Sequence, residues 1–313
     1  MESINTKIPK RRFSKEGINK KNAYFYMLPA IIFMVTLIGI PLIQVIWNSF
    51  HAKSLTNPAL NDFIGFENYS KVFADTLFMG NMKNTVIWTI GSVLGEIVLG
   101  LIVGIALNQK IKGRVFFRSM IIVPWIVPIA VAGLTWSWML NPDYGIVNYL
   151  LEKTGIIEES IYWLGNKNTA LLTVTFINIW RTFPYWVISI LAGLQTIPDE
   201  LHEAAAMDGA SITKRFFNVT LPGIKSVLST LIFMHIVWTS VNFDFIWITT
   251  EGGPNYASET LPIMIYRYAM KNYDIGKSSV LSVIMIIILL AIFALVPISK
   301  FVVKKVKGAR NYD

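Results

Sequence analysis

The feature that most constrains this chain is a set of long stretches without a charged residue. No Asp, Glu, Lys or Arg occurs between Lys21 and Lys53, between Arg118 and Asp143, or between Lys277 and Lys300. Each gap exceeds the roughly 20 residues that an α-helix needs to cross the bilayer core. Only 15% of the 313 residues are charged, against roughly 25% in soluble domains. The sequence therefore predicts an integral membrane protein.

Three further apolar stretches each contain a single charged residue. They cover 84–109 with Glu96, 168–197 with Arg181, and 226–250 with Asp244. A charge at the bilayer centre costs about 2.5–3.5 kcal/mol on the insertion scale, so each of these residues needs a partner or water. Together with the uncharged stretches they predict an all-α integral membrane fold with six transmembrane helices.

The basic residues give this fold an orientation. Six spans put both termini on one side, and most of the 28 Lys and Arg residues fall on that side, which makes it cytoplasmic by the positive-inside rule. The predicted organisation is a cytoplasmic basic tail at 1–23, a membrane domain at 24–303 and a cytoplasmic tail at 304–313. The first tail is interpreted as an anchor against anionic lipid, not as a surface for nucleic acid.

Several classes of active site are excluded or disfavoured. The chain has no cysteine, which removes disulfides and thiolate chemistry. His202-Glu203 begins like the H-E-x-x-H zinc motif, but Ala206 stands where the second histidine is required. Gly276-Lys277-Ser278 resembles the end of a phosphate loop, but Lys271 occupies the position of its leading glycine. We therefore expect no catalytic residues, no metal site, no bound cofactor and no ATP site in this chain.

The longest predicted cytoplasmic connection, at about 198–222, has strong local helix signals. Pro198 followed by two acidic residues starts a helix, and Gly209 ends it. Ser211 can cap a second short helix that ends before Pro222. The sequence predicts a helix, a turn and a helix that lie under the membrane.

This connection resembles a known family. Glu203-Ala204-Ala205, then Gly209, and later Val219-x-Leu221-Pro222, are similar to the EAA loop of bacterial binding-protein-dependent ABC importers. Val219 stands where that family often has Ile. Further motifs agree: Trp180-Arg181-x-x-Pro184-Tyr185, Leu194-Gln195-x-Ile197-Pro198 and Gly252-Gly253-Pro254. The chain as a whole resembles the maltose-type sugar permeases, with an ABC importer type I fold.

The resemblance implies a set of partners and a location. The loop would dock on a cytoplasmic ATPase, present in two copies and binding ATP and Mg, through Glu203, Ala204, Ala205, Gly209, Phe216 and Phe217. A second permease, an extracytoplasmic binding protein and a carbohydrate substrate complete the expected assembly, which lies in a bacterial inner membrane. The alternative for the loop is an amphipathic helix on lipid, but Glu200, Glu203 and Asp208 suit an anionic surface poorly.

Candidate substrate contacts lie in the fourth and fifth spans. Trp238, Asn242 and Asp244 combine a flat apolar face with an amide and a carboxylate, which suits sugar rings and their hydroxyls. Tyr185 and Asn242 also match positions in the family's substrate site. Arg181 either lines the translocation cavity or pairs with Glu96, and the tryptophans alternatively belong to the interfacial belt. Because Arg181 is positively charged, an anionic substrate is a further alternative.

These features predict the membrane subunit of an ATP-driven carbohydrate importer. The main alternative is a secondary transporter driven by an ion or proton gradient, with Glu96, Arg181 and Asp244 as its relay. An intramembrane enzyme is a further alternative, but the sequence offers no arrangement of nucleophile and base for it.

Overall fold

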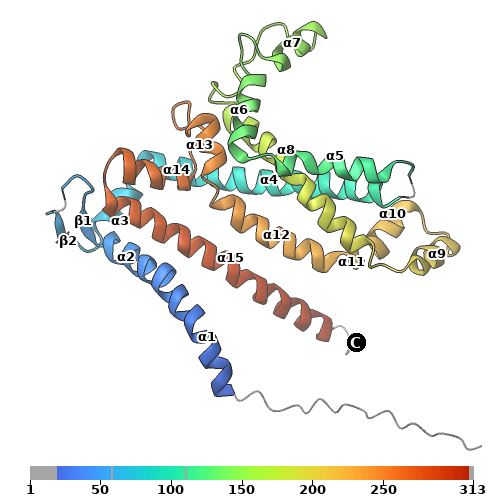
Figure 1. The fold of residues 1–313 in the computed structure, drawn as a ribbon, viewed down its shortest axis with the longest axis horizontal. Coiled ribbons are helices and arrows are strands. Elements are labelled where there is room, and N and C mark those ends of the chain that lie inside the picture. The colour runs from blue at the N-terminus through green and yellow to red at the C-terminus, as the bar shows by residue number, and fades with distance from the viewer. Residues whose placement is uncertain (1–19, 58, 110, 310–313) are drawn as a thin grey trace, which may run out of the picture.

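The structure is a computed structural model that describes residues 20–57, 59–109 and 111–309, with side chains described from 24 to 294. The basic residues before Lys20 and the end of the chain after Ala309 lie outside this part. Almost every described element is helical (Figure 1). The exception is a hairpin of β1 (His51–Lys53) and antiparallel β2 (Asn61–Phe63), in which His51 pairs with Phe63.

The first predicted span forms one continuous apolar helix. It consists of α1 (Lys20–Met34), the π-helical turn η1 (Val35–Gly39) and α2 (Ile40–Ser49). Only its α2 end packs against the body, on α15, and α1 extends away from it (Figure 1). Most of its apolar side chains are exposed, which suits contact with lipid or another helix. After the hairpin, α3 (Glu67–Phe73) leads into the second span.

The centre of the fold is α4 (Thr76–Asn108), which packs lengthwise on α8 (Ala170–Leu194). Four glycines of α4 permit this approach. A Cβ added at Gly100 would lie 2.7 Å from Trp186 Cβ, and Gly91, Gly95 and Gly104 similarly meet α8 side chains. Such small residues let membrane helices approach closely, so substitution by a larger residue at Gly100 would push the two helices apart.

The third predicted span is not one straight helix. It consists of α5 (Arg114–Ile126) and α6 (Ile129–Met139), which meet at an angle of 93°. Pro128 stands between them, and a residue before proline avoids the helical region. Beyond α6, the short helix α7 (Ile146–Lys153) lies at the tip of a projection from the body (Figure 1).

The fifth predicted span, 226–250, is also interrupted. It contains α12 (Lys225–Ser240) and α13 (Asp244–Thr250), separated by residues 241–243. Three elements follow: α14 (Leu261–Tyr266), the π-helical η3 (Arg267–Lys271) and α15 (Ile275–Ala309). The last helix continues beyond residue 303, where the sequence places the end of the membrane domain.

The number of spans depends on how the bent helices are counted. Among the described residues, three helical stretches are long and apolar enough to cross a bilayer, and two bent helix pairs raise the number to five. A sixth would be α8, which has 25 residues but includes Asn178 and Arg181. The all-helical membrane fold is confirmed, and the count of six stays a prediction.

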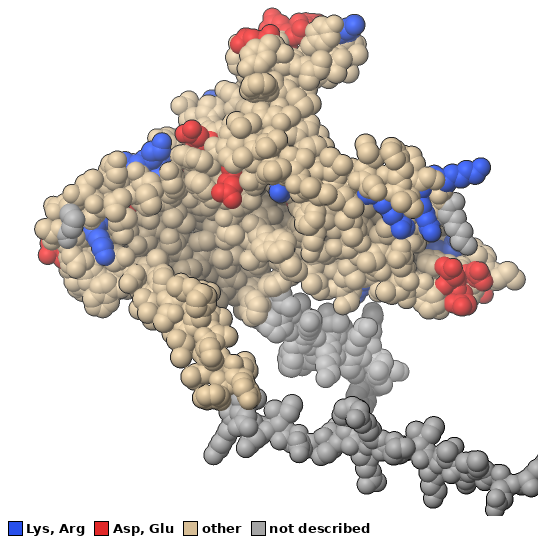
Figure 2. Space-filling view, in the orientation of Figure 1, with Lys and Arg blue, Asp and Glu red and all other residues tan. Residues whose placement is uncertain are grey.

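Side chains from α4 enter all three buried apolar clusters. Phe78 packs with α14 and α15, Trp88 packs with α8 and α13, and Val93 packs with α8 and α12. Charged side chains gather at the two ends of the body and on the α7 projection, and the surface between them is mostly uncharged (Figure 2). This separation is typical of a protein whose middle lies in lipid and whose ends meet water.

Candidate functional site

The predicted cytoplasmic connection folds as expected. We call residues 198–222 the coupling loop; it contains α9 (Asp199–Met207), α10 (Ile212–Arg215), the π-helical η2 (Phe216–Thr220) and the first residues of α11 (Leu221–Gly223). Gly209 ends α9 with φ of +74°, a left-handed conformation that glycine adopts without strain. Ser211 caps α10 by accepting a hydrogen bond from Lys214 N at 3.4 Å. The prediction that the second helix ends before Pro222 is wrong, because the helical segment that begins at Ile212 continues through η2 and α11 to Gly223. Pro222 is tolerated there because it lies in the first turn of α11.

The coupling loop projects from one end of the helices (Figure 1), and several of its apolar side chains are exposed. Met207 is 89% exposed, Ile212 78% and Phe217 58%. Glu203 and Ala204 are exposed, whereas Ala205 and Phe216 are half-buried. Apart from its own chain neighbours, no atom of the described residues lies within 4 Å of a Cβ added at Gly209. The loop therefore has open, partly apolar surface around the predicted contact residues, as a docking surface requires.

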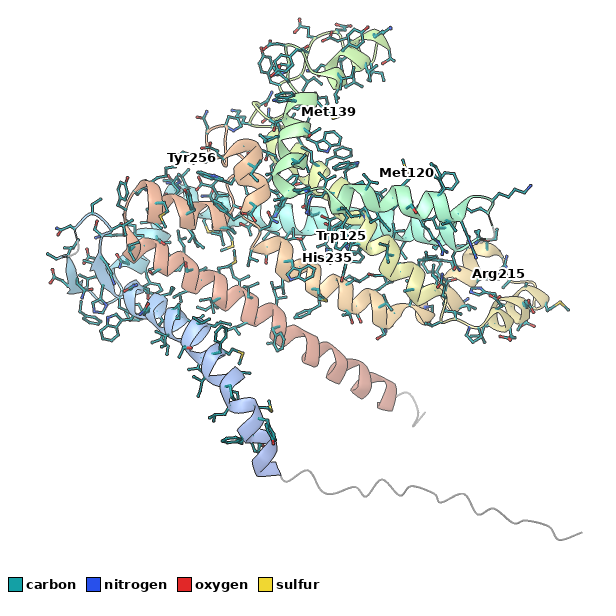
Figure 3. All side chains as sticks on the ribbon, viewed as in Figure 1. Met120, Trp125, Met139, Arg215, His235 and Tyr256 are labelled. Carbon is teal, nitrogen blue, oxygen red and sulfur yellow. The ribbon has the colours of Figure 1, made fainter. Side chains whose placement is uncertain are left out.

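A polar cavity of about 420 Å³ lies between the coupling loop and the membrane helices. Its lining includes Asn108 and Gln109 at the end of α4, Glu203 from α9, and Arg215 (labelled in Figure 3). The Arg215 Nε atom is buried without a hydrogen-bond partner. This cavity leaves room for α9 to move relative to α4 and α8.

The middle of the membrane domain contains a buried polar cluster of Ser92, Glu96, Asn178, Trp186 and His235. Glu96 is fully buried, and its Oε2 accepts a hydrogen bond from Trp186 Nε1 at 2.8 Å. His235 Nδ1 lies 2.8 Å from the same oxygen and 3.1 Å from Trp186 Nε1. We place the ring proton on Nδ1, so that Nδ1 and Trp186 Nε1 both donate to Glu96. Asn178 Nδ2 bonds Ser92 Oγ at 3.1 Å and approaches Glu96 Oε1 at 3.4 Å. The cluster ties together α4, α8 and α12.

The suggested pairing of Glu96 with Arg181 is wrong. Glu96 contacts His235 instead, and helix geometry explains why it does not contact Arg181. Ile179 of α8 abuts Gly95 of α4, and two residues further along a helix the side chain points about 200° away. Arg181 thus points away from α4, and its Nε is buried without a partner. The proposed relay also lacks contact, since no ion pair joins Glu96, Arg181 and Asp244 within the described residues.

Next to this cluster, four rings from three helices form what we call the ring group: Trp125, Tyr185, His235 and Trp238. The Tyr185 ring centre lies 5.7 Å from Trp125, 5.4 Å from His235 and 6.4 Å from Trp238. Trp125 and His235 are labelled in Figure 3 in the middle of the helices. Trp238 is 54% exposed. The ring group thus offers an accessible aromatic surface at the predicted substrate residues Tyr185 and Trp238.

Asn242 and Asp244 lie at the break between α12 and α13. Asn242 Oδ1 accepts a hydrogen bond from Phe245 N at 3.2 Å, which stabilises the start of α13. Asp244 is exposed as the first residue of α13. An interrupted membrane helix exposes backbone polar groups, and this is tolerated where it lines a cavity or is buried in protein. The break therefore concentrates polar groups beyond the ring group.

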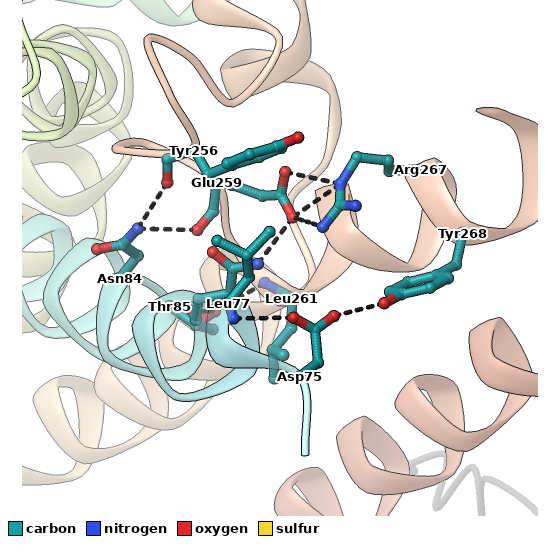
Figure 4. Close-up of polar contacts among 10 residues, drawn as sticks. Asp75, Leu77, Asn84, Thr85, Tyr256, Glu259, Leu261, Arg267 and Tyr268 are labelled. Atoms are coloured by element: carbon teal, nitrogen blue, oxygen red, sulfur yellow. Dashed lines mark hydrogen bonds and ion pairs between the residues drawn. The ribbon is translucent and has the colours of Figure 1, made fainter. Parts of the chain in front are cut away.

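At the start of α4, a polar network holds the segment that follows α13 in place (Figure 4). Arg267 donates three hydrogen bonds to buried Glu259, at 2.8, 3.0 and 3.2 Å, and Asn81 Nδ2 donates to Glu259 at 2.7 Å. Tyr268 donates to Asp75, which also caps α4. Burial, followed by the hydrogen bond to Asp75, raises the pKa of Tyr268, so the phenol remains a donor. The network holds this segment rigidly against α4.

Sequence reasoning missed His235, Trp186 and Trp125 as members of these sites. The signal for His235 was available, because an imidazole within an apolar stretch needs a polar partner. Neither the identity of that partner nor the approach of Trp125 to Tyr185 follows from spacing along the chain, since each contact joins different helices.

Comparison with known proteins agrees with this architecture. Residues 96–306 match the family described as "Binding-protein-dependent transport system inner membrane component". The chain is 34% identical to the sulfoquinovosyl glycerol transport system permease protein SmoG of Agrobacterium fabrum, over 84% of this chain and 85% of that one. It is 32% identical to the trehalose/maltose transport system permease protein MalF of Thermococcus litoralis, over 85% and 90% of the two chains.

Solved structures share the fold. A chain of a bacterial alginate ABC transporter, in complex with an alginate pentasaccharide-bound periplasmic protein, superposes with a TM-score of 0.76 at 20% identity, covering 88% of this chain and 92% of that one. The secondary-transporter alternative finds no support among these relatives. The chain belongs to the family of inner membrane components of binding-protein-dependent transport systems, the permease subunits of ABC importers.

Proposed function

We propose that this chain forms one half of the translocation path of an ATP-driven carbohydrate importer. The relatives named for sulfoquinovosyl glycerol and for trehalose and maltose support a carbohydrate cargo, as does the alginate transporter that shares the fold. A second permease would supply the other half of the path. An external binding protein would deliver the substrate, and both termini would lie in the cytoplasm.

The observation that carries this proposal is the exposed coupling loop. Its apolar side chains Met207, Ile212 and Phe217 are accessible, and Glu203 adds a charge beside the small residues Ala204 and Gly209. Such a surface suits docking in a groove of another protein better than contact with anionic lipid. Its partner would be a pair of ATPase subunits, which would bind the ATP and Mg while this chain binds no cofactor.

The cavity under the coupling loop supports a route from ATP hydrolysis to the membrane helices. Movement of α9 toward the cavity would bring Glu203 and Arg215 closer together and shift the ends of α4 and α8, whose residues line the same space. Those two helices carry the polar cluster and Tyr185 of the ring group. A rigid displacement of α8 would thereby change access to the ring group, as alternating access requires.

The substrate would bind at the ring group and at the break in the fifth span. Aromatic faces of Tyr185 and Trp238 suit the apolar faces of sugar rings, and Asn242 and Asp244 offer groups that bond hydroxyls. Residues of the second permease would complete the site.

A charge reversal tests the docking assignment. Glu203→Lys should lower the amount of ATPase that copurifies with this chain, because it places a cation where the proposed groove receives a carboxylate. Glu158→Lys on the exposed outer projection is the matched control and should leave copurification unchanged. Equal recovery of the ATPase with Glu203→Lys and wild type would remove Glu203 from the interface.

A further inference from the structure

Arg181 is an uncompensated charge in the middle of a membrane helix. Four ion pairs form among the described residues, and none of them includes Arg181. Its side chain is half-buried, and its Nε is buried without a hydrogen-bond partner. Charged residues inside membrane spans are costly, and they persist where they face a partner or a water-filled path. The guanidinium therefore lacks a counter-anion among the residues whose side chains are described.

The nearby carboxylates do not serve as that anion. Glu96 is engaged by His235 and Trp186 on the opposite side of α8. Asp244 is exposed at the start of α13 and forms no ion pair with Arg181. Because Glu96 is already engaged by other side chains, Arg181 has no counter-ion among the described residues around α8.

Arg181 lies on the same side of α8 as the proposed substrate residue Tyr185. Residues four apart on a helix are separated by only about 40° around the axis and about 6 Å along it. Tyr185 lies in the ring group, in contact with Trp125 and Trp238 from two other helices. Arg181 is thus one turn from the aromatic surface, displaced toward the start of α8, which is the end from which the binding protein would release its substrate.

We propose that Arg181 binds an anionic group on the substrate, so that the cargo is an acidic carbohydrate. This inference rests on the carbohydrate importer function proposed above. The planar guanidinium matches the geometry of carboxylate, sulfonate and phosphate oxygens, and charge-assisted hydrogen bonds are stronger than neutral ones. A neutral sugar would leave the guanidinium without a counter-charge when water is displaced from the site.

The experiment uses the complete complex with its second permease, ATPase and binding protein in lipid vesicles. Stimulation of ATP hydrolysis is measured with matched probes: digalacturonate against digalactose, and trehalose 6-phosphate against trehalose. Arg181→Gln removes the charge, and Arg181→Lys retains it. Arg114→Gln, at the exposed start of α5, removes an equal charge far from the ring group and is the control. Copurification of the ATPase establishes that each variant assembles.

At least one acidic probe should stimulate hydrolysis at lower concentration than its neutral counterpart. Arg181→Gln should reduce that preference by about tenfold or more, whereas Arg181→Lys and Arg114→Gln should keep most of it. The inference is overturned if no acidic probe exceeds its neutral counterpart, or if Arg181→Gln keeps the preference. Stimulation by neutral sugars alone would leave the carbohydrate function standing, and an assembled complex that responds to no sugar would overturn both.

Discussion

The contact between His235 and Glu96 leads us to predict that this hydrogen bond stabilises the centre of the membrane domain. His235→Leu still fills the space among Tyr185, Trp186 and Trp238, but it removes the Nδ1 donor that lies 2.8 Å from Glu96 Oε2. His235→Asn is the matched variant, because its amide nitrogen can take the place of Nδ1. We expect His235→Leu to be much more destabilising than His235→Asn.

The expected magnitude follows from burial. Glu96 is fully buried and His235 is 2% exposed, and removing one partner of such a pair costs about 3–5 kcal/mol. His235→Asn loses mainly ring contacts, at a cost of about 1–2 kcal/mol. The difference of about 2–3 kcal/mol corresponds to a difference in Tm of roughly 4–12 °C, if the scale for domains of 150–250 residues applies.

Thermal unfolding can be followed by tryptophan fluorescence, since the chain has 10 tryptophans and Trp186 lies in the cluster. The cycle is completed by the single variant Glu96→Gln and by the double variant Glu96→Gln with His235→Leu. Because the double variant removes the buried charge along with its partner, it should be more stable than His235→Leu alone. Equal Tm values for the Leu and Asn variants, together with additive effects in the double variant, would refute a stabilising hydrogen bond and leave only ring packing.

Three further predictions concern the coupling loop, the substrate site and the topology. Gly209→Trp should abolish coupled transport while the chain still inserts, whereas Gly209→Asn, which tolerates a left-handed backbone, should retain it; equal transport by both would contradict close approach of a partner. Asn242→Asp keeps an acceptor for Phe245 N but loses the amide donor. It should therefore weaken the free energy of substrate binding, measured from the substrate concentration that stimulates ATP hydrolysis, by about 0.5–1.5 kcal/mol without lowering assembly. An unchanged substrate dependence would leave Asn242 with the role of a helix cap only. Cysteine placed at Tyr256 should react with an impermeant reagent in intact cells, and cysteine at Lys214 should not, in a chain without native cysteine; the reverse pattern would invert the topology.

The coupling loop could be predicted in detail because its signals are local. Pro198 precedes the first helical residue, Gly209 supplies the left-handed turn and Ser211 caps the next helix. Each of these preferences acts over one or two turns of chain and does not depend on what packs nearby.

The interruptions of the membrane helices were not predicted. Hydropathy treats a long apolar stretch as one span, which joined α5 to α6 across Pro128. In the same way the apolar stretch with the single charge Asp244 joined α12 to α13 across residues 241–243. Pro128 indicated the first of these breaks, because proline disrupts the interior of a helix. The second break contains neither glycine nor proline, and its backbone is stabilised by Asn242 through a contact that spacing alone does not reveal.

The partners of the buried charged residues could not be predicted, because they depend on how the helices pack against one another. Glu96 and Arg181 have opposite charges and similar depths, which made them an attractive pair. The close contact of Gly95 with Ile179 sets the rotation of α8, and this rotation directs Arg181 away from Glu96. Glu96 instead contacts His235, which lies on a third helix.

We propose that ATP hydrolysis by a partner subunit drives transport through this chain. The most direct test measures substrate uptake by vesicles that contain the assembled complex and its binding protein, with ATP on the side of the coupling loop. We predict uptake that requires ATP and persists when ionophores collapse the proton and sodium gradients. Uptake that proceeds without ATP and disappears with the ionophores would contradict the account.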